Sequence, residues 1–232
     1  DVYRRQNQDA EEITVILHGN TRLKAELVGR DKRTDIAVLK VKPKSKLTAV
    51  KFGDSDSARV GDWVMAIGNP FGLENTVTTG VISATDRTVR GPDGSLFHGL
   101  MQTDASINPG NSGGPLLNAE GTLIGINTAV YTGGQGIGFA IPVHLVRLIT
   151  DSLIESGRVD RGWLGIYIAE LNPHLAERIG APPGVQGVVV RSLVRGGPAD
   201  LGKLLPGDLI QRVEDRLVDS PLPCATRSPI AP

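Results

Sequence analysis

Short segments of alternating hydrophobic and polar residues fill the first two thirds of the chain. Residues 13–17 form a β-branched run that is closed by a turn at 18–20, and apolar residues then alternate with charged ones from Leu23 to Leu27. Such alternation buries one face of a strand, so the pattern predicts an antiparallel hairpin. Further strands are predicted at Ile36–Val41, Trp63–Ile67, Thr76–Ser83, Leu123–Ala129 and Gly136–Ala140. This region is predicted to be all-β.

A helix is predicted to end this region. Ile141–Ser156 carries Leu145, Ile149 and Leu153 at helical spacing, and Gly157 follows as a stop signal. After a short polar linker, a smaller unit is predicted from a strand at Leu164–Ala169, a helix at Pro173–Ile179 and strands at Gly187–Leu193 and Asp208–Val213. From Pro221 onward the Pro- and Ser-rich composition predicts a disordered tail.

Composition narrows the classes of protein. The 232 residues suit one large or two modest domains, and 25 basic residues balance 25 acidic ones. This balance argues against a nucleic-acid groove and against a polybasic membrane patch. The single cysteine, Cys224, excludes an internal disulfide and a cysteine-based zinc site. No run of 18 apolar residues predicts a membrane span, and the polar residues 1–7 show no signal-peptide pattern.

The segment Asn108–Pro115 (NPGNSGGP) is the strongest candidate for chemistry. Glycines on both sides of Ser112 allow a sharp turn that exposes its hydroxyl and points nearby amides at one spot. Such amides stabilise an oxyanion, and removing one donor typically costs about 3–4 kcal/mol. The same composition is also typical of an ordinary loop, and the segment alone leaves both interpretations equally open.

The wider sequence resembles the HtrA/Deg-type serine proteases. Similarity covers residues 103–117 around Ser112 and also residues 34–39, 68–72 and 136–142. The resemblance runs from about Ala10 to about Ser220. It implies a mostly β protein with a chymotrypsin-like double β-barrel, the first barrel incomplete, followed by a truncated α+β PDZ domain. The expected domains are a non-matching polar lead-in at 1–12, a trypsin-like protease domain at 13–157, a partial PDZ domain at 161–220 and a disordered tail at 221–232.

The resemblance assigns roles to particular residues. It implies that Ser112 is the nucleophile, that Asp35 is the triad acid, and that the amides of Gly110 and Ser112 form the oxyanion hole. It also implies that a strand edge borders the substrate pocket and pairs with the substrate backbone. That edge is formed by Ile126, Asn127, Thr128 and Ala129. Without the similarity of its flanking residues to the family, Asp35 would be interpreted as a surface aspartate at a turn.

The base of the triad is missing from the pattern. A serine hydroxyl needs a neighbouring imidazole to remove its proton, and gapless counting puts Arg5 where the family has this histidine. Arginine stays protonated in proteins and does not replace it. His18, His98, His144 and His174 are expected at surface positions in a turn, a loop, a helix and the second unit. A fragment, a shifted reading frame and an inactive homologue remain alternative explanations.

The second unit begins with a segment similar to the carboxylate-binding loop of PDZ domains. The residues expected to bind a peptide carboxylate are Trp163, Leu164, Gly165 and Ile166. Successive exposed amides in such a turn capture a terminal carboxylate, and the strand that follows pairs with the peptide backbone. The alternative is an ordinary turn ahead of a core strand.

The resemblance implies a serine-type endopeptidase of the bacterial periplasm or cell envelope. Such an enzyme cleaves unfolded or misfolded proteins through an acyl-enzyme, needs no metal or other cofactor, and binds C-terminal peptides but no nucleic acid. The intact family forms homotrimers or larger assemblies, largely through an N-terminal part that has no match here. The alternative function is a non-catalytic peptide-binding or chaperone-like PDZ protein, which would hold polypeptides without Ser112-dependent cleavage. A dinucleotide-binding pattern at residues 134–138 fails because Phe139 occupies the third glycine position.

Overall fold

A computed structural model describes residues 12–17, 19–69, 76–91, 94–130, 136–213 and 216–218, with only the backbone described at 129–130 and 216–217. The predicted tail from Pro221, His18 and all of the lead-in except Glu12 lie outside these residues. The chain divides into two compact units, Asp1–Val159 and Asp160–Pro232. The division falls within the polar linker that the sequence predicts after the first helix.

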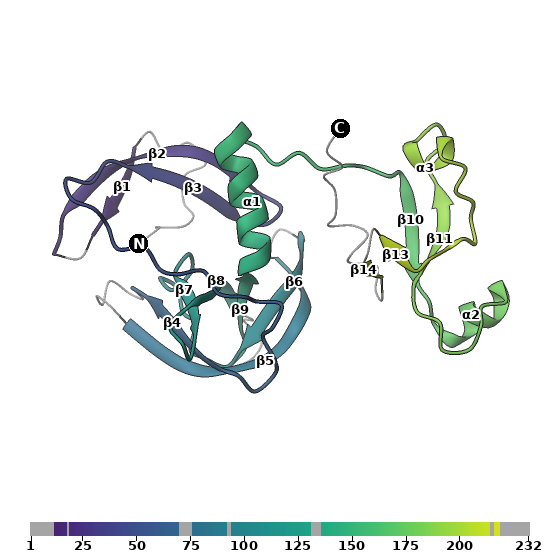
Figure 1. Ribbon diagram of the computed structural model, residues 1–232, viewed down its shortest axis with the longest axis horizontal. Helices are drawn as coiled ribbons and strands as arrows, with labels where there is room; N and C mark the ends of the chain where they lie inside the picture. Colours follow the sequence, from purple (N-terminus) through teal and green to yellow (C-terminus); the bar gives the residue numbers. More distant parts are fainter. Residues whose placement is uncertain are drawn as a thin grey trace. The chain divides into compact units, whose positions relative to one another are not determined.

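The first unit combines a small sheet, a closed barrel and one helix, α1 (Val143–Ser156) (Figure 1). The sheet is antiparallel, with strand order β1-β2-β3, and consists of β1 (Ile13–Ile16), β2 (Arg22–Asp31) and β3 (Ile36–Val41). The barrel has the order β4-β5-β6-β9-β8-β7 and consists of β4 (Trp63–Gly68), β5 (Thr76–Arg90), β6 (Leu96–Thr103), β7 (Pro115–Asn118), β8 (Leu123–Val130) and β9 (Gly138–Pro142). The fold is mostly β, as predicted.

The second unit is a small α+β arrangement. Its three-stranded sheet has the order β10-β11-β12, and a separate pair joins β13 to β14. The elements are β10 (Ile166–Glu170), α2 (Pro173–Ile179), β11 (Val188–Leu193), α3 (Pro198–Leu201), β12 (Leu209–Ile210), β13 (Arg212–Val213) and β14 (Arg216–Leu217).

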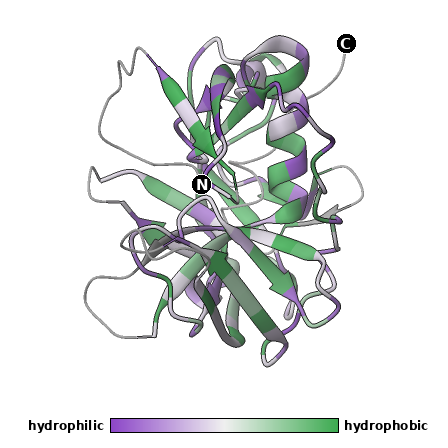
Figure 2. Ribbon diagram, turned by 90° about the vertical axis from the view of Figure 1, so that its left-hand side faces the viewer, coloured by the Kyte–Doolittle hydropathy of each residue, from purple (hydrophilic) through white to green (hydrophobic). Residues whose placement is uncertain are grey.

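Alternation along the strands builds the core of the barrel. On β4, Val64 and Ala66 are buried while Trp63 is exposed, as the two-residue period of a strand requires. They pack with buried residues of the neighbouring strands, among them Ile82, Leu116 and Ile124. Hydrophobic residues, green in Figure 2, accordingly concentrate in the strands, whereas they alternate with polar residues along α1.

Helix α1 joins the small sheet to the barrel. It contacts β2 and β3 on one side and β8 and β9 on the other (Figure 1). Its buried residues Val146, Ile149 and Leu153 pack in one cluster with Ile36 of β3 and with residues of β6 and β9. Gly29 of β2 approaches the end of the helix so closely that an added Cβ would lie 2.6 Å from the Gly157 carbonyl oxygen. The position of β2 and β3 therefore depends on α1.

The free backbone N–H and C=O groups at the two ends of α1 find their hydrogen-bond partners in different ways. Pro142 precedes the helix and provides no side-chain cap, but the Ser55 hydroxyl, from a distant segment, accepts a hydrogen bond of 3.1 Å from the His144 N–H. At the other end Gly157 is left-handed, with φ of 74°, and its N–H donates to the Leu153 carbonyl. The predicted stop at Gly157 is confirmed.

Most of the predicted elements are confirmed, but several limits differ: the helix begins at Val143 instead of Ile141, because β9 extends from Gly138 to Pro142 instead of from Gly136 to Ala140. The strand at Ile36–Val41 and the helix at Pro173–Ile179 have the predicted limits. However, β5 continues to Arg90, and β6 was not predicted because Gly99 and His98 interrupt its apolar pattern. His98 consequently lies within a strand and is half-buried, not in the surface loop that the sequence suggests.

We expect Leu153→Ala to destabilise the first unit by about 2–5 kcal/mol, because Leu153 is fully buried between α1 and the sheet. The neighbouring residue Ile154 is 62% exposed, so Ile154→Ala is a matched control with an expected change within about 0.5 kcal/mol. Urea unfolding of both variants measures the difference. Equal shifts for the two variants would contradict this packing of α1.

Candidate active site

The loop that carries Ser112 connects β6 to β7 and is held mainly by backbone hydrogen bonds. The Asn69 N–H donates to the Gly110 carbonyl at 3.1 Å, and the Gly113 N–H donates to the Asn127 carbonyl at 2.8 Å. In return, the Asn127 N–H donates to the Gly114 carbonyl at 2.9 Å. The residue after β4 therefore holds the loop before Ser112, and β8 holds it after Ser112.

The glycines of this loop are required by its geometry. Gly110 and Gly113 have φ of 108° and 84°, values that residues with a side chain rarely adopt. Gly114 approaches β4 so closely that an added Cβ would lie 2.1 Å from the Ile67 carbonyl oxygen. The glycine pattern that identified the segment thus encodes a specific loop conformation.

Side chains inside the loop complete its frame. Asn111 is fully buried, and its Nδ2 donates to the Ser106 carbonyl, which also accepts from the Thr78 hydroxyl. The Asp104 Oδ1 accepts the Val81 N–H at 2.7 Å and so ties the start of the loop to β5. Asp104 therefore holds the loop in place.

Ser112 and Asp35 are brought together through a third residue, Thr128. The Ser112 Oγ donates a hydrogen bond of 3.0 Å to the Thr128 carbonyl, and the Thr128 hydroxyl donates one of 3.2 Å to the Asp35 Oδ2. Thr128 lies on β8 of the barrel, while Asp35 lies in the turn between β2 and β3. The two residues predicted for catalysis, 77 positions apart in sequence, thus share one neighbour.

The amides predicted for the oxyanion hole are available. The N–H groups of Gly110 and Ser112 have no hydrogen-bond acceptor among the residues that the structure describes. Because unpaired N–H donors stabilise negative charge on a carbonyl oxygen, these amides are consistent with the predicted oxyanion hole.

The described histidines make their contacts elsewhere. His98 Nδ1 lies 3.2 Å from the Thr88 hydroxyl, and His174 lies on α2 of the second unit. Within the described part of the chain, the Ser112 hydroxyl has no imidazole partner. His18 lies outside the described residues.

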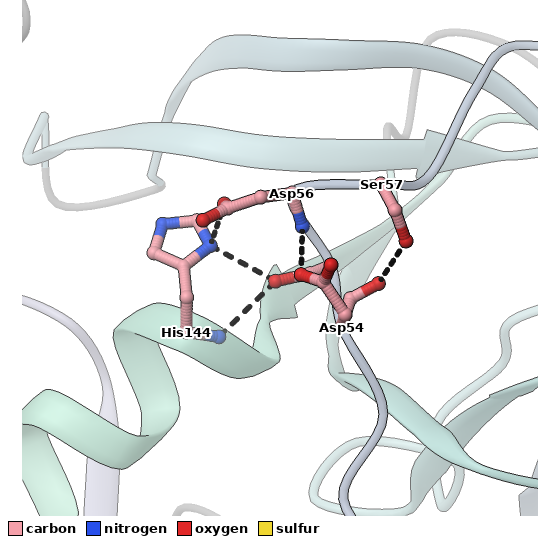
Figure 3. Close-up of polar contacts among 5 residues, drawn as sticks. Asp54, Asp56, Ser57 and His144 are labelled. Atoms are coloured by element: carbon pink, nitrogen blue, oxygen red, sulfur yellow. Dashed lines mark hydrogen bonds and ion pairs between the residues drawn. The ribbon is translucent and has the colours of Figure 1, made fainter.

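His144 belongs to a polar cluster at the start of α1 (Figure 3). Its Nδ1 lies 2.9 Å from the Ser55 hydroxyl and 3.0 Å from Asp56 Oδ1. Asp54 and Ser57 extend the cluster, because Asp54 Oδ1 accepts the Asp56 N–H and the Asp54 carbonyl accepts the Ser57 hydroxyl. These contacts tie the segment before β4 to the helix, so we interpret His144 as structural.

Comparison with known proteins identifies the family. Residues 2–126, more than half of the chain, match the trypsin-like peptidase domain family. The chain belongs to this family. The match begins at residue 2 and so includes most of the segment predicted as a non-matching lead-in.

Relatives place the chain among the HtrA-type members. It is 44% identical to a probable periplasmic serine endoprotease, DegP-like, of Rhizobium meliloti (strain 1021), over 94% of this chain and 43% of that protein. Identity is 45% to the protein of the same name in Pseudomonas putida (strain GB-1), over 87% of this chain and 42% of that one. The chain therefore spans less than half the length of these curated relatives.

Solved structures agree with this grouping. The HtrA-type protease AlgW with a tripeptide is 48% identical, with a TM-score of 0.77 over 90% of this chain and 69% of that one. AlgW with a decapeptide is 46% identical, with a TM-score of 0.74 over 94% of this chain and 66% of that one.

The predicted substrate edge of this HtrA-type chain is partly occupied by its own barrel. Ile126 pairs with Pro115 of β7 and with Ile141 of β9, and both backbone groups of Asn127 bond to the nucleophile loop. Pairing with β7 ends at Ile126, whereas β9 continues alongside β8 to Val130. Beyond Ile126, the structure describes no further pair between β7 and β8, and the Thr128 carbonyl accepts the Ser112 hydroxyl.

The loop predicted to bind a carboxylate lies ahead of β10. Gly165 has φ of 72°, and its carbonyl accepts the Val194 N–H at 2.8 Å, while the Leu164 carbonyl accepts the Ala199 N–H at 2.9 Å. The amides of Leu164 and Gly165 have no acceptor among the described residues. Trp163 is 61% exposed, and Ile166 begins β10, which pairs with β11 alone among the described strands.

The described residues lack two further features. They contain no group of three or more His, Cys, Asp or Glu side chains arranged to hold a metal. They also contain no helix that is long and apolar enough to cross a membrane.

We expect the stability of the first unit to fall as the pH drops below about 6.5, the ordinary pKa of histidine. Burial and the charge of Arg33 lower the pKa of His98, and Asp86 opposes them in part. The unfolded chain therefore binds a proton at His98 before the folded protein does, which favours unfolding at acidic pH. Thermal melts between pH 7.5 and 5.5 measure this loss.

His98→Gln should flatten that part of the pH dependence, because it removes the titrating group. His174→Gln, at an exposed position in the second unit, is the control and should leave the dependence unchanged. An identical pH profile for His98→Gln and the parent would refute the attribution of this loss of stability to His98.

Proposed function

We propose that this chain carries the reaction centre of a serine endopeptidase that cleaves unfolded or misfolded proteins. The observation that carries the proposal is the hydrogen-bonded series Ser112–Thr128–Asp35 beside two unpaired amides. The names of the relatives as serine endoproteases support it, and their description as periplasmic supports the same location for this protein.

In the proposed reaction, the Ser112 Oγ attacks the carbonyl carbon of a peptide bond while its proton passes to an imidazole base. The amides of Gly110 and Ser112 hold the resulting oxyanion. The base then protonates the leaving amine, the C–N bond breaks, and water hydrolyses the acyl-enzyme. Asp35 orients and stabilises the imidazolium, and Thr128 fixes Asp35. Thr128 and Ala129 pair with the substrate backbone.

The second unit is proposed to bind C-terminal peptides at Trp163, Leu164, Gly165 and Ile166. The unpaired amides of Leu164 and Gly165 suit a carboxylate, and the free edge of β10 suits an extended peptide. The solved structures of AlgW, a similar HtrA-type protease, with a tripeptide and with a decapeptide support peptide binding. We propose the domain limits 13–157 and 161–220 for the two functions. For the intact protein we propose a homotrimer or a larger assembly.

The first experiment tests Ser112 with an external base. Because no described imidazole contacts Ser112, we expect β-casein to be cleaved measurably only when free imidazole is added. The increase should be about tenfold, a small part of the roughly 100- to 10,000-fold that a positioned base provides. Ser112→Ala should show no cleavage with or without imidazole.

Cleavage that persists in Ser112→Ala would refute the nucleophile. A folded parent that binds casein but never cleaves it, even with imidazole, would instead favour the alternative of a chaperone-like binding protein.

A second experiment tests the carboxylate loop. In a Trp63→Phe background, Trp163 is the single tryptophan and reports on binding by fluorescence. We expect a peptide with a free, apolar C-terminus to bind at least about tenfold more tightly than its C-terminal amide, because hydrogen bonds to a charged group contribute about 1.5–3 kcal/mol. Equal affinity for the two peptides would contradict a carboxylate site.

A further inference from the structure

We propose that Asp31 and Thr34 are positioning residues that hold Asp35 against Thr128. The inference rests on the proposed function, in which Asp35 is the triad acid. It assigns a task to a buried carboxylate four residues before Asp35 that the reaction itself does not use.

The turn between β2 and β3 is organised by one carboxylate oxygen. Asp31 ends β2, is 8% exposed and pairs in register with Ile36, the first residue of β3. Its Oδ2 accepts hydrogen bonds from both the backbone N–H and the hydroxyl of Thr34. Two donors of one residue on one acceptor fix the position and the rotation of Thr34.

Asp35 is left to complete the turn between two fixed neighbours. Thr34 is held by Asp31, and Ile36 is held by the strand pairing and by its burial against α1. Asp35 adopts φ of 63°, a left-handed conformation that persists in residues other than glycine where the surroundings enforce it. This conformation accompanies the contact of its carboxylate with the Thr128 hydroxyl.

Closing a hairpin with a buried carboxylate costs free energy of desolvation. Taking a charged group out of water is unfavourable unless it is well hydrogen-bonded, and exposed polar residues close most turns without it. In the barrel, the turn between β7 and β8 is closed by a neutral group instead. There, Asn118 Oδ1 accepts from the N–H of Thr122 at 2.8 Å and from its hydroxyl at 2.9 Å. The Asn118–Thr122 turn has the same pair of hydrogen bonds, from the N–H and the hydroxyl of one threonine to one side-chain oxygen, and serves as a control.

The experiment compares Thr34→Val, Thr34→Ser and Thr122→Val in the full chain. Valine removes the hydroxyl and keeps the N–H bond, while serine restores the hydroxyl. One measurement does not depend on activity: the 13C chemical shift of the Asp35 carboxyl carbon in aspartate-labelled protein. The other is the rate of imidazole-dependent casein cleavage, and thermal melts report the stability of each variant.

We expect Thr34→Val to move the Asp35 carboxyl signal and to lower the cleavage rate about tenfold, because small displacements of a reacting constellation are costly. Thr34→Ser should recover both. Thr122→Val should lower the melting temperature comparably and change neither the signal nor the rate.

An unchanged Asp35 signal in Thr34→Val, or equal effects of Thr34→Val and Thr122→Val, would overturn the proposal. If the Asp35 signal moves in Thr34→Val and recovers in Thr34→Ser while no protein cleaves casein, the positioning role stands and the proposed protease function fails. The two proposals therefore fail in different ways.

Discussion

The candidate site depends on the packing of α1 between the small sheet and the barrel. Asp35 comes from the sheet, whereas Ser112 and Thr128 come from the barrel, and α1 contacts strands of both. The contact between Gly29 and the end of α1 leaves no room for a side chain, so the sheet rests directly on the helix. A hydrogen bond of 3.2 Å between Thr128 and Asp35 is possible because this packing fixes the turn after β2.

One residue of β8, Thr128, contacts both Ser112 and Asp35. The backbone carbonyl of Thr128 accepts a hydrogen bond from the Ser112 hydroxyl, and the Thr128 hydroxyl donates one to the Asp35 carboxylate. The residue before it, Asn127, uses both backbone groups to hold the nucleophile loop. One strand of a closed barrel thus positions three parts of the site, and its rigidity comes from pairing with β7 and β9 on its two sides.

Sequence patterns predicted the parts of the site whose conformation is local. The glycines around Ser112 predicted a sharp turn, and Gly110 and Gly113 have the positive φ values that such a turn needs, whereas the roles predicted for Ser112 and Gly110 came from the family resemblance. Asp35 required the similarity of its flanking residues, since an aspartate at a turn carries no signal of its own. The strand at Ile36–Val41 was predicted because its apolar run is short and uninterrupted.

The features that were missed depend on contacts between distant segments. Thr128 was expected to border a substrate, but its bond to Asp35 spans 93 residues and follows from the placement of β8 against the sheet. The cap of α1 by Ser55 spans 89 residues, and no local pattern near Pro142 indicates it. Strand β6 was missed because its pairing with β5 and β9 outweighs the weak strand preference of His98-Gly99.

The orientation of the Ser112 hydroxyl connects these observations to reactivity. Its proton is directed at the Thr128 carbonyl, an acceptor that holds the side chain in place but is far too weak a base to remove a proton. This hydrogen bond orders the Ser112 side chain without activating its hydroxyl. Binding of an imidazole near Ser112 would offer the hydroxyl a stronger acceptor, and the amides proposed for the oxyanion hole have no acceptor among the described residues. The structure therefore separates two requirements of acyl transfer: the barrel supplies the preorganised polar surroundings, whereas activation of the nucleophile depends on a base that the described residues do not place beside it.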